Sequence, residues 1–147
     1  MSFDVSGLAP TSPEGEHFYR SVWDWRPIVT YLTTTWPHVA TTDPRWHTND
    51  GWGLPANDAK RLAALMQFAI QDGSAAQYVI DRDKTIANLP DEICNICNGT
   101  GRRGLLPCNV CDSHGVRRPR ATMYSLELED IRQFAAFLAS SGGFKID

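Results

Sequence analysis

Four cysteines that lie close together in the sequence could hold one metal ion. Cys94, Cys97, Cys108 and Cys111 follow the spacing C-x2-C-x10-C-x2-C. Two residues between the cysteines of a pair allow one tight turn to direct both sulfurs at the same ion, and two such turns complete the tetrahedron of thiolates that zinc prefers. The pattern predicts Zn2+ bound by all four cysteines. Because no coordination position stays open, the ion would be structural rather than catalytic.

Disulfides are the main alternative to a metal site. A secreted disulfide framework spreads its cysteines along the chain, whereas here 93 residues precede the first one and the start of the chain lacks the pattern of a signal peptide. We therefore expect reduced, metal-bound thiols in the cytoplasm. Three alternatives are weaker: iron in the same cage, a thioredoxin-like redox pair, and His114 in place of one cysteine. The histidine is the weaker ligand candidate because it lies in a loop next to glycine.

Glycines follow both cysteine pairs. Residues 94–101 match C-x-x-C-x-G-x-G, and glycine allows the backbone to turn sharply and direct N–H groups at sulfur. This octet resembles one repeat of the cysteine-rich zinc region of DnaJ-type co-chaperones. The resemblance implies a small antiparallel zinc hairpin that supports contacts with proteins. In the second octet, residues 108–115, Ser113 replaces one glycine, so a different second turn is possible. Without a His-Pro-Asp signature, co-chaperone activity is not implied.

Five arginines lie around the cysteines. They are Arg102, Arg103, Arg117, Arg118 and Arg120, and with a single aspartate they give residues 94–120 a formal charge of +4 before thiolate ionisation. Such arginines could contact the phosphates of a nucleic acid or the acidic surface of a partner protein. They could also simply offset the anionic metal cluster. Because the remainder of the chain is acidic, we favour the roles that need no nucleic acid.

A second candidate site lies in the loop before the central helix. His47 and Asp50 could form the acid–base pair of a small hydrolase, but Asp50-Gly51 is also a strong turn signal. No candidate nucleophile lies at a spacing from these residues that indicates a catalytic site, so we expect a structural turn and no enzymatic activity. The G-x-G-x-x-G run at 99–104 lies inside the metal loop rather than between a strand and a helix, so no small-molecule cofactor is expected.

The rest of the chain has the spacing of amphipathic helices. Residues 1–13 contain Gly and Pro and suggest a loose start. Helices are expected over 14–25 and 28–36, and Pro27 either ends the first or opens the second as its first residue. The strongest helical pattern covers 55–72, and a further helix follows from Ser74 to about residue 87. Ser125 is expected to cap the last helix, after which Phe144 and Ile146 tuck back.

Length and composition complete the prediction. The chain has 147 residues, 42% of them apolar, and no run long enough to span a membrane. We expect an α+β protein that is mainly helical, with four to five helices and an inserted zinc-ribbon-like β-hairpin. The expected parts are a helical body (1–93), a zinc-binding hairpin lobe (94–120) and a C-terminal strand and helix that pack on the body (121–147). All five tryptophans precede residue 53 and are expected mainly in the core rather than in an exposed patch.

Short stretches along the whole chain also resemble small uncharacterised phage and bacterial proteins. They include residues 15–20, 25–27, 48–51 and 142–144, besides the cysteine turns. This resemblance implies a phage-type modulator, such as an inhibitor of a host defence complex comparable to an anti-CRISPR protein. The first functional hypothesis is therefore a non-enzymatic protein-binding module. Nucleic-acid binding through the arginines and hydrolysis at His47 and Asp50 are the rivals.

Overall fold

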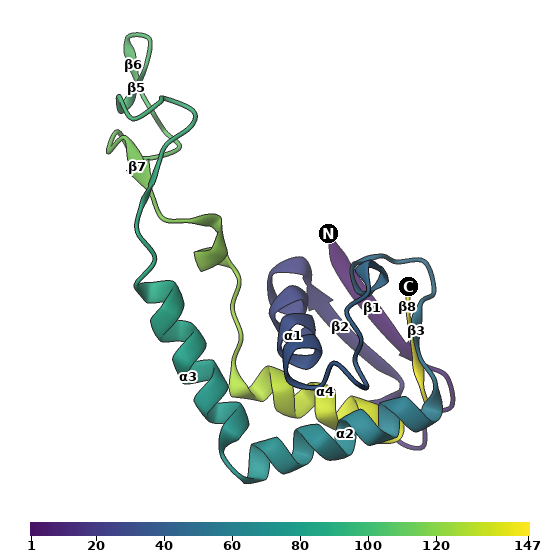
Figure 1. The fold of residues 1–147 in the computed structure, drawn as a ribbon. Helices are drawn as coiled ribbons and strands as arrows, with labels where there is room; N and C mark the ends of the chain where they lie inside the picture. Colours follow the sequence, from purple (N-terminus) through teal and green to yellow (C-terminus); the bar gives the residue numbers. More distant parts are fainter. The chain divides into compact units, whose positions relative to one another are not determined.

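The computed structural model describes all 147 residues, which form two compact units. Unit 1 comprises Met1–Ile80 and Tyr124–Asp147, and unit 2 comprises Asp81–Met123. Four helices and small antiparallel sheets make an α+β protein, as expected (Figure 1). None of the helices combines the length and the apolar character needed to cross a bilayer.

Unit 1 contains a four-stranded sheet that the sequence pattern did not reveal. Its strands are β1 (Ser2–Gly7), β2 (His17–Ser21), β3 (Gly53–Leu54) and β8 (Phe144–Ile146), in the order β2-β1-β8-β3, and every neighbouring pair is antiparallel. The expected loose start was therefore wrong. Phe3 and Val5 alternate with exposed Asp4 along β1, which is the period of a half-buried strand. The expectation that Phe144 and Ile146 tuck back is confirmed, because both are buried in β8.

The helix expected over residues 14–25 was also wrong. A short 3-10 helix, η1 (Pro13–Gly15), precedes β2, and α1 (Val22–Thr35) then runs through Pro27 without interruption. Phe18 and Trp25 are both buried, so their spacing fitted a helix although Phe18 reaches the core from a strand. Pro27 costs α1 one hydrogen bond, and its buried ring contributes apolar contact in return.

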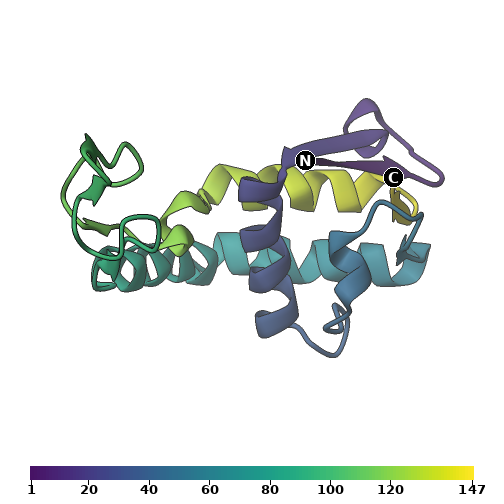
Figure 2. The ribbon, with the colours of Figure 1, turned by 90° about the horizontal axis from the view of Figure 1, so that it is seen from above.

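The other three helices lie close to where the sequence placed them. They are α2 (Ala56–Gln71), α3 (Ser74–Ala87) and α4 (Leu128–Ser140), and α2 packs along α4 in unit 1 (Figure 2). The cap of α4 differs from the expectation. Glu127 is the N-cap residue, and its backbone N–H donates to Asp130 Oδ2 at 2.9 Å in a capping box. The hydroxyl of Ser125 instead donates to Asp24 Oδ1 at 2.8 Å.

Aromatic side chains fill the core of unit 1. Trp25 is fully buried, donates its indole N–H to the carbonyl of Trp46 at 2.7 Å, and meets the ring of Phe134 edge-on at 5.5 Å. Trp36 and Trp46 are also buried, which agrees with the expected core role of the tryptophans. This core holds the sheet, α1, α2 and α4 together.

Unit 2 has no comparable core. Its strands are β4 (Glu92–Ile93), β5 (Arg102–Arg103), β6 (Leu106–Pro107) and β7 (Val116–Arg117), in the antiparallel pairs β4–β7 and β5–β6, followed by the 3-10 helix η3 (Arg120–Met123). Apart from the four cysteines, the only buried apolar side chain of unit 2 is that of Pro119. Residues 92–117, from β4 to β7, are called the cysteine lobe below.

Candidate metal centre

The four cysteines converge in the cysteine lobe, and their geometry fits one tetrahedral metal ion. Their Sγ atoms all lie within 4.8 Å of one another, and all four side chains are buried. The Sγ atoms are 4.0 Å apart for Cys94 and Cys108, and 3.7 Å apart for Cys97 and Cys111. Sulfurs about 2.3 Å from a central zinc lie about 3.8 Å from each other in a tetrahedron. The cysteines are thus positioned to hold a metal ion, and none forms a disulfide.

The two halves of the cage are near copies of each other. The N–H of Gly101 donates to Cys97 Sγ and the N–H of Gly115 donates to Cys111 Sγ, each at 3.3 Å. Such N–H bonds stabilise negative charge on a sulfur and fix its direction. In both octets, therefore, the N–H of the last glycine donates to the sulfur of the second cysteine.

Each half also closes the other. The N–H of Cys94 donates to the carbonyl of Gly115, and the N–H of Cys108 donates to the carbonyl of Gly101, both at 2.9 Å. A methyl group at Gly101 would stand 2.3 Å from the carbonyl oxygen of Ser113. Glycine is required at this position because the backbones of the two turns are in contact there and leave no room for a side chain.

Ser113 does not give the second turn a different conformation. Its φ of 64° lies in the same left-handed region as the φ of 82° at Gly99, the equivalent residue of the first turn. The preceding residues, Asn98 and Asp112, match as well, with φ of 52° and 50°. Asn and Asp tolerate this region better than other residues with a side chain, whereas serine adopts it at a cost.

Replacement of that serine is expected to stabilise the cysteine lobe. Ser113→Gly removes the left-handed strain of a residue with a Cβ, worth about 1 kcal/mol. The chelator concentration at which half the metal is released should therefore rise. Gly104→Ser is the matched reverse substitution: it adds a Cβ at a φ of 64° with open space around it but outside both turns, so the midpoint should not rise. An unchanged or lower midpoint for Ser113→Gly would contradict the strain.

The thiols of the empty cage would ionise unequally. Burial opposes ionisation of Cys97, but the N–H of Gly101 and the neighbouring thiols outweigh it and lower the pKa of Cys97 to about 6. Burial and the neighbouring thiols raise the pKa of Cys111 to about 11 despite the N–H of Gly115. A divalent cation resolves this conflict, because it stabilises all four thiolates together.

His114 is not a member of the cage. Its Nδ1 lies 2.9 Å from the carbonyl oxygen of Cys111, and its side chain is exposed. The group of side chains that could hold a metal ion consists of the four cysteines without a histidine.

The five arginines have different environments. Arg118 donates to the carbonyl of Leu89 at 2.6 Å and to that of Ile86 at 3.0 Å, and it pairs with Asp91 Oδ1 at 2.9 Å. It thereby satisfies carbonyls at the carboxyl end of α3, where a cation also complements the helix dipole. Arg117 stands opposite Glu92 in the β4–β7 pair. Arg120 lies exposed in η3.

Arg102 and Arg103 are the arginines of the hairpin that connects the two cysteine pairs. Both lie exposed in β5, and neither guanidinium has a hydrogen bond or an ion pair. Gly104 has positive φ and Leu105 does not, which is the pattern of a type II′ turn. Leu105 is 96% exposed and Leu106 is 70% exposed. Residues 102–106 are called the hairpin tip below.

The candidate hydrolase residues are not joined. Asp50 accepts the backbone N–H of Trp52 at 3.3 Å, as expected of a turn residue, and no hydrogen bond or ion pair connects it to His47. His47 Nδ1 is buried without a hydrogen-bond partner. Burial and the nearby charge of Arg26 lower the pKa of His47, so its ring is neutral near pH 7.

Comparison of the chain with protein-family models, with curated proteins and with solved structures finds no match.

Proposed function

We propose that this chain is a non-enzymatic protein-binding module in which Zn2+, held by Cys94, Cys97, Cys108 and Cys111, folds the cysteine lobe and presents the hairpin tip to a partner protein. The observation that carries the proposal is the exposure of Leu105 and Leu106 beside two unpaired arginines, Arg102 and Arg103, of the neighbouring strand. Adjacent leucines in water are unfavourable unless they are buried in a complex, and contiguous exposed apolar surface marks interaction sites.

The chemistry of the hairpin tip also describes the partner surface. Two leucines fit an apolar pocket, and the two arginines next to this anchor favour an acidic rim on the same side. Further exposed apolar side chains lie on the same lobe, namely Ile93, Ile96, Val110 and Val116. We infer a protein partner in a reducing compartment such as the cytoplasm. The resemblance to phage and bacterial proteins suggests that this partner belongs to a host defence complex.

Nucleic-acid binding is less well supported. Arg118 is engaged at α3, and Arg117 stands opposite acidic Glu92 in the β4–β7 register, so both are less available for phosphates than Arg102 and Arg103. Residues 79–123 contain no Phe, Tyr or Trp side chain on which a base could stack. Hydrolysis at His47 and Asp50 has no geometric support in the absence of a contact between them.

Capture of partner proteins from a bacterial lysate by the zinc-loaded chain tests the proposal. Burial of one leucine contributes about 1.5–3 kcal/mol, so Leu105→Ser should weaken the captured complex by about 10-fold to 150-fold. Ile80→Ser is the control, because Ile80 is exposed in α3 outside the cysteine lobe. Equal binding by both variants would reject the hairpin tip as the docking surface.

The same preparation distinguishes the nucleic-acid alternative. We expect no change in fluorescence anisotropy when the chain is added to labelled DNA or RNA at low salt. Salt-sensitive binding that disappears in an Arg102→Glu, Arg103→Glu double variant would instead establish the alternative.

A further inference from the structure

Strand β2 forms a free edge of the sheet in unit 1. It pairs with β1 on one side, and the sheet order places no strand on its other side. Two hydrogen bonds fix which backbone groups of β2 face outward. Gly7 N–H donates to Glu16 O at 2.9 Å, and Val22 N–H donates to Met1 O at 3.2 Å, at the two ends of the same register.

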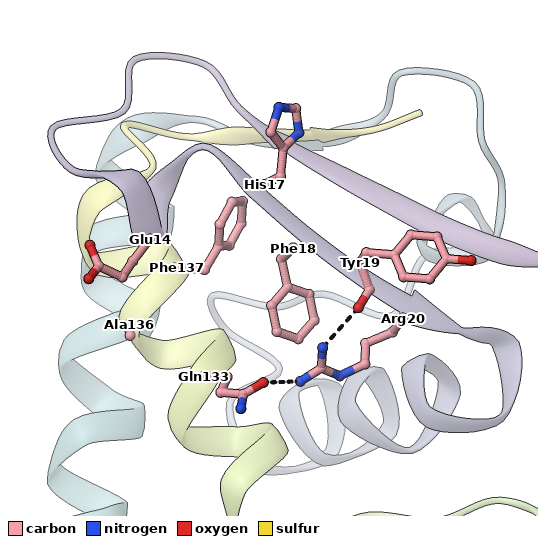
Figure 3. Close-up of a pocket in the computed structure, with 8 residues that line it drawn as sticks. All are labelled: Glu14, His17, Phe18, Tyr19, Arg20, Gln133, Ala136 and Phe137. Atoms are coloured by element: carbon pink, nitrogen blue, oxygen red, sulfur yellow. Dashed lines mark hydrogen bonds between the residues drawn. The ribbon is translucent and has the colours of Figure 1, made fainter.

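These bonds assign the alternate residues between them. In an antiparallel ladder, hydrogen-bonded pairs alternate with pairs that direct their backbone groups away from each other. Phe18 and Arg20 therefore bond to β1, whereas the N–H and C=O groups of His17 and Tyr19 point to the free edge. The guanidinium of Arg20 confirms the direction, since it donates to the carbonyl of Tyr19 at 2.8 Å (Figure 3). That carbonyl keeps a second lone pair.

A hollow of about 350 Å3 lies beside this edge, between β2 and α4. Phe18, Ala136 and Phe137 provide its apolar lining, Glu14 stands at one end, and Arg20 reaches Gln133 at the other (Figure 3). Of the two apolar lining residues on α4, Ala136 is exposed and Phe137 is buried. An added strand would place every second side chain over this lining, because successive side chains of a strand alternate between the two faces.

The charges around the hollow favour a basic ligand. Asp130 balances the charge of Arg20, since Asp130 Oδ1 lies 3.3 Å from Arg20 Nε. The side chain of Ser12 holds the pKa of Glu14 below its usual value, so this carboxylate stays ionised. Unit 1 as a whole carries twelve acidic and seven basic side chains, which disfavours pairing of β2 with β2 of a second copy.

We propose that the free edge of β2 binds an extended, basic segment of a partner protein, which adds as a fifth strand and inserts an apolar side chain into the hollow between β2 and α4. The backbone groups of His17 and Tyr19 supply hydrogen bonds that any strand can make, and the hollow supplies selectivity. This site lies in unit 1 and does not depend on the metal or on the hairpin tip.

Amide hydrogen exchange of the free, zinc-loaded chain is the first test. The amides of His17 and Tyr19 should exchange rapidly, while those of Phe18 and Arg20 should be protected by the ladder. Protection of Tyr19 in the free chain, or a dimer in analytical ultracentrifugation that Tyr19→Pro dissociates, would mean that the edge is already covered and would overturn the proposal.

Selection of random twelve-residue peptides displayed on phage, with the full zinc-loaded chain as target, is the second test. Selected peptides should carry a basic residue and alternate apolar residues, and should protect the Tyr19 amide. Tyr19→Pro removes one outward N–H without removing a ladder bond and should weaken binding at least about tenfold relative to Tyr19→Ala, which loses the same side chain but keeps that N–H.

A second variant pair keeps the test valid if Tyr19→Pro does not fold. Ala136→Leu fills the hollow and should also weaken binding at least about tenfold, whereas Ala139→Leu, at an exposed position of the same helix away from the hollow, should not. Failure to select any peptide, or equal affinities within both pairs, would overturn the proposal. Loss of binding by Leu105→Ser would assign the peptides to the hairpin tip instead.

Discussion

Loss of the metal ion is expected to unfold the cysteine lobe while unit 1 stays folded. A chelator, or Cys97→Ser, removes the ion that would hold the cysteines together. These cysteines are the only buried cluster of unit 2, and the exposed leucines and valines of the lobe cannot replace it. Apparent binding energies of structural zinc reach about 10–16 kcal/mol in small zinc domains, so most of the folding free energy of the lobe should come from the ion. Backbone NMR spectra with and without chelator would show which amides lose their dispersion.

The control for this experiment is Asn95→Ser, at an exposed position between the cysteines of the first pair. It should bind one zinc per chain by elemental mass spectrometry, as the parent does, whereas Cys97→Ser should lose at least about 100-fold in affinity. A chelated chain that keeps the amide dispersion of residues 92–117 would contradict a metal-dependent fold. An ion other than zinc in the purified chain would correct the identity of the metal and leave the fold argument unchanged.

Truncation of Trp25 is expected to destabilise unit 1 and to leave metal binding by the cysteine lobe intact, which is the reverse of what metal loss should do. Trp25 is fully buried, contacts the rings of Phe3 and Phe134, and loses both its packing and its indole hydrogen bond in Trp25→Ala. Large aromatic truncations cost about 3–5 kcal/mol, a major share of the roughly 5–15 kcal/mol that stabilises a typical domain. Urea denaturation followed by far-UV circular dichroism should show a strongly lowered midpoint, with metal binding retained.

Phe68→Ala gives the matched comparison, since Phe68 is an aromatic residue of α2 that is 67% exposed. Its unfolding free energy should stay within about 0.5 kcal/mol of the parent value. A similar midpoint for Trp25→Ala and Phe68→Ala would show that the aromatic cluster does not carry the stability of unit 1.

Local patterns predicted the parts of this chain that depend on neighbouring residues. The helical stripe of Leu62 and Met66 correctly indicated α2, because an amphipathic helix is encoded within one segment. The octets around Cys94 and Cys108 indicated two turns directed at one site, because cysteine spacing and glycine positions act over a few residues. The cysteine geometry supports this prediction, and the identity of the ion stays a prediction.

The sheet could not be predicted in the same way, because its strands are joined by partners far along the chain. β1 pairs with β2 nearby but also with β8, more than 130 residues later. Phe18 fits either a helix or a strand by spacing, and only the pairing with Val5 decides between them. The docking edge of β2 was missed for this reason. Arg118 was likewise grouped with the other arginines, since no local signal shows that it reaches the end of α3.

The mutual closure of the two cysteine turns has an evolutionary consequence. Cys94 bonds to Gly115 and Cys108 bonds to Gly101, so the cage is complete without any contribution from the side chains of residues 102–106. Those five positions can diversify under selection from a changing target while the fold is conserved. A set of related chains with invariant cage residues and highly variable residues at 102–106 would indicate selection by a changing target.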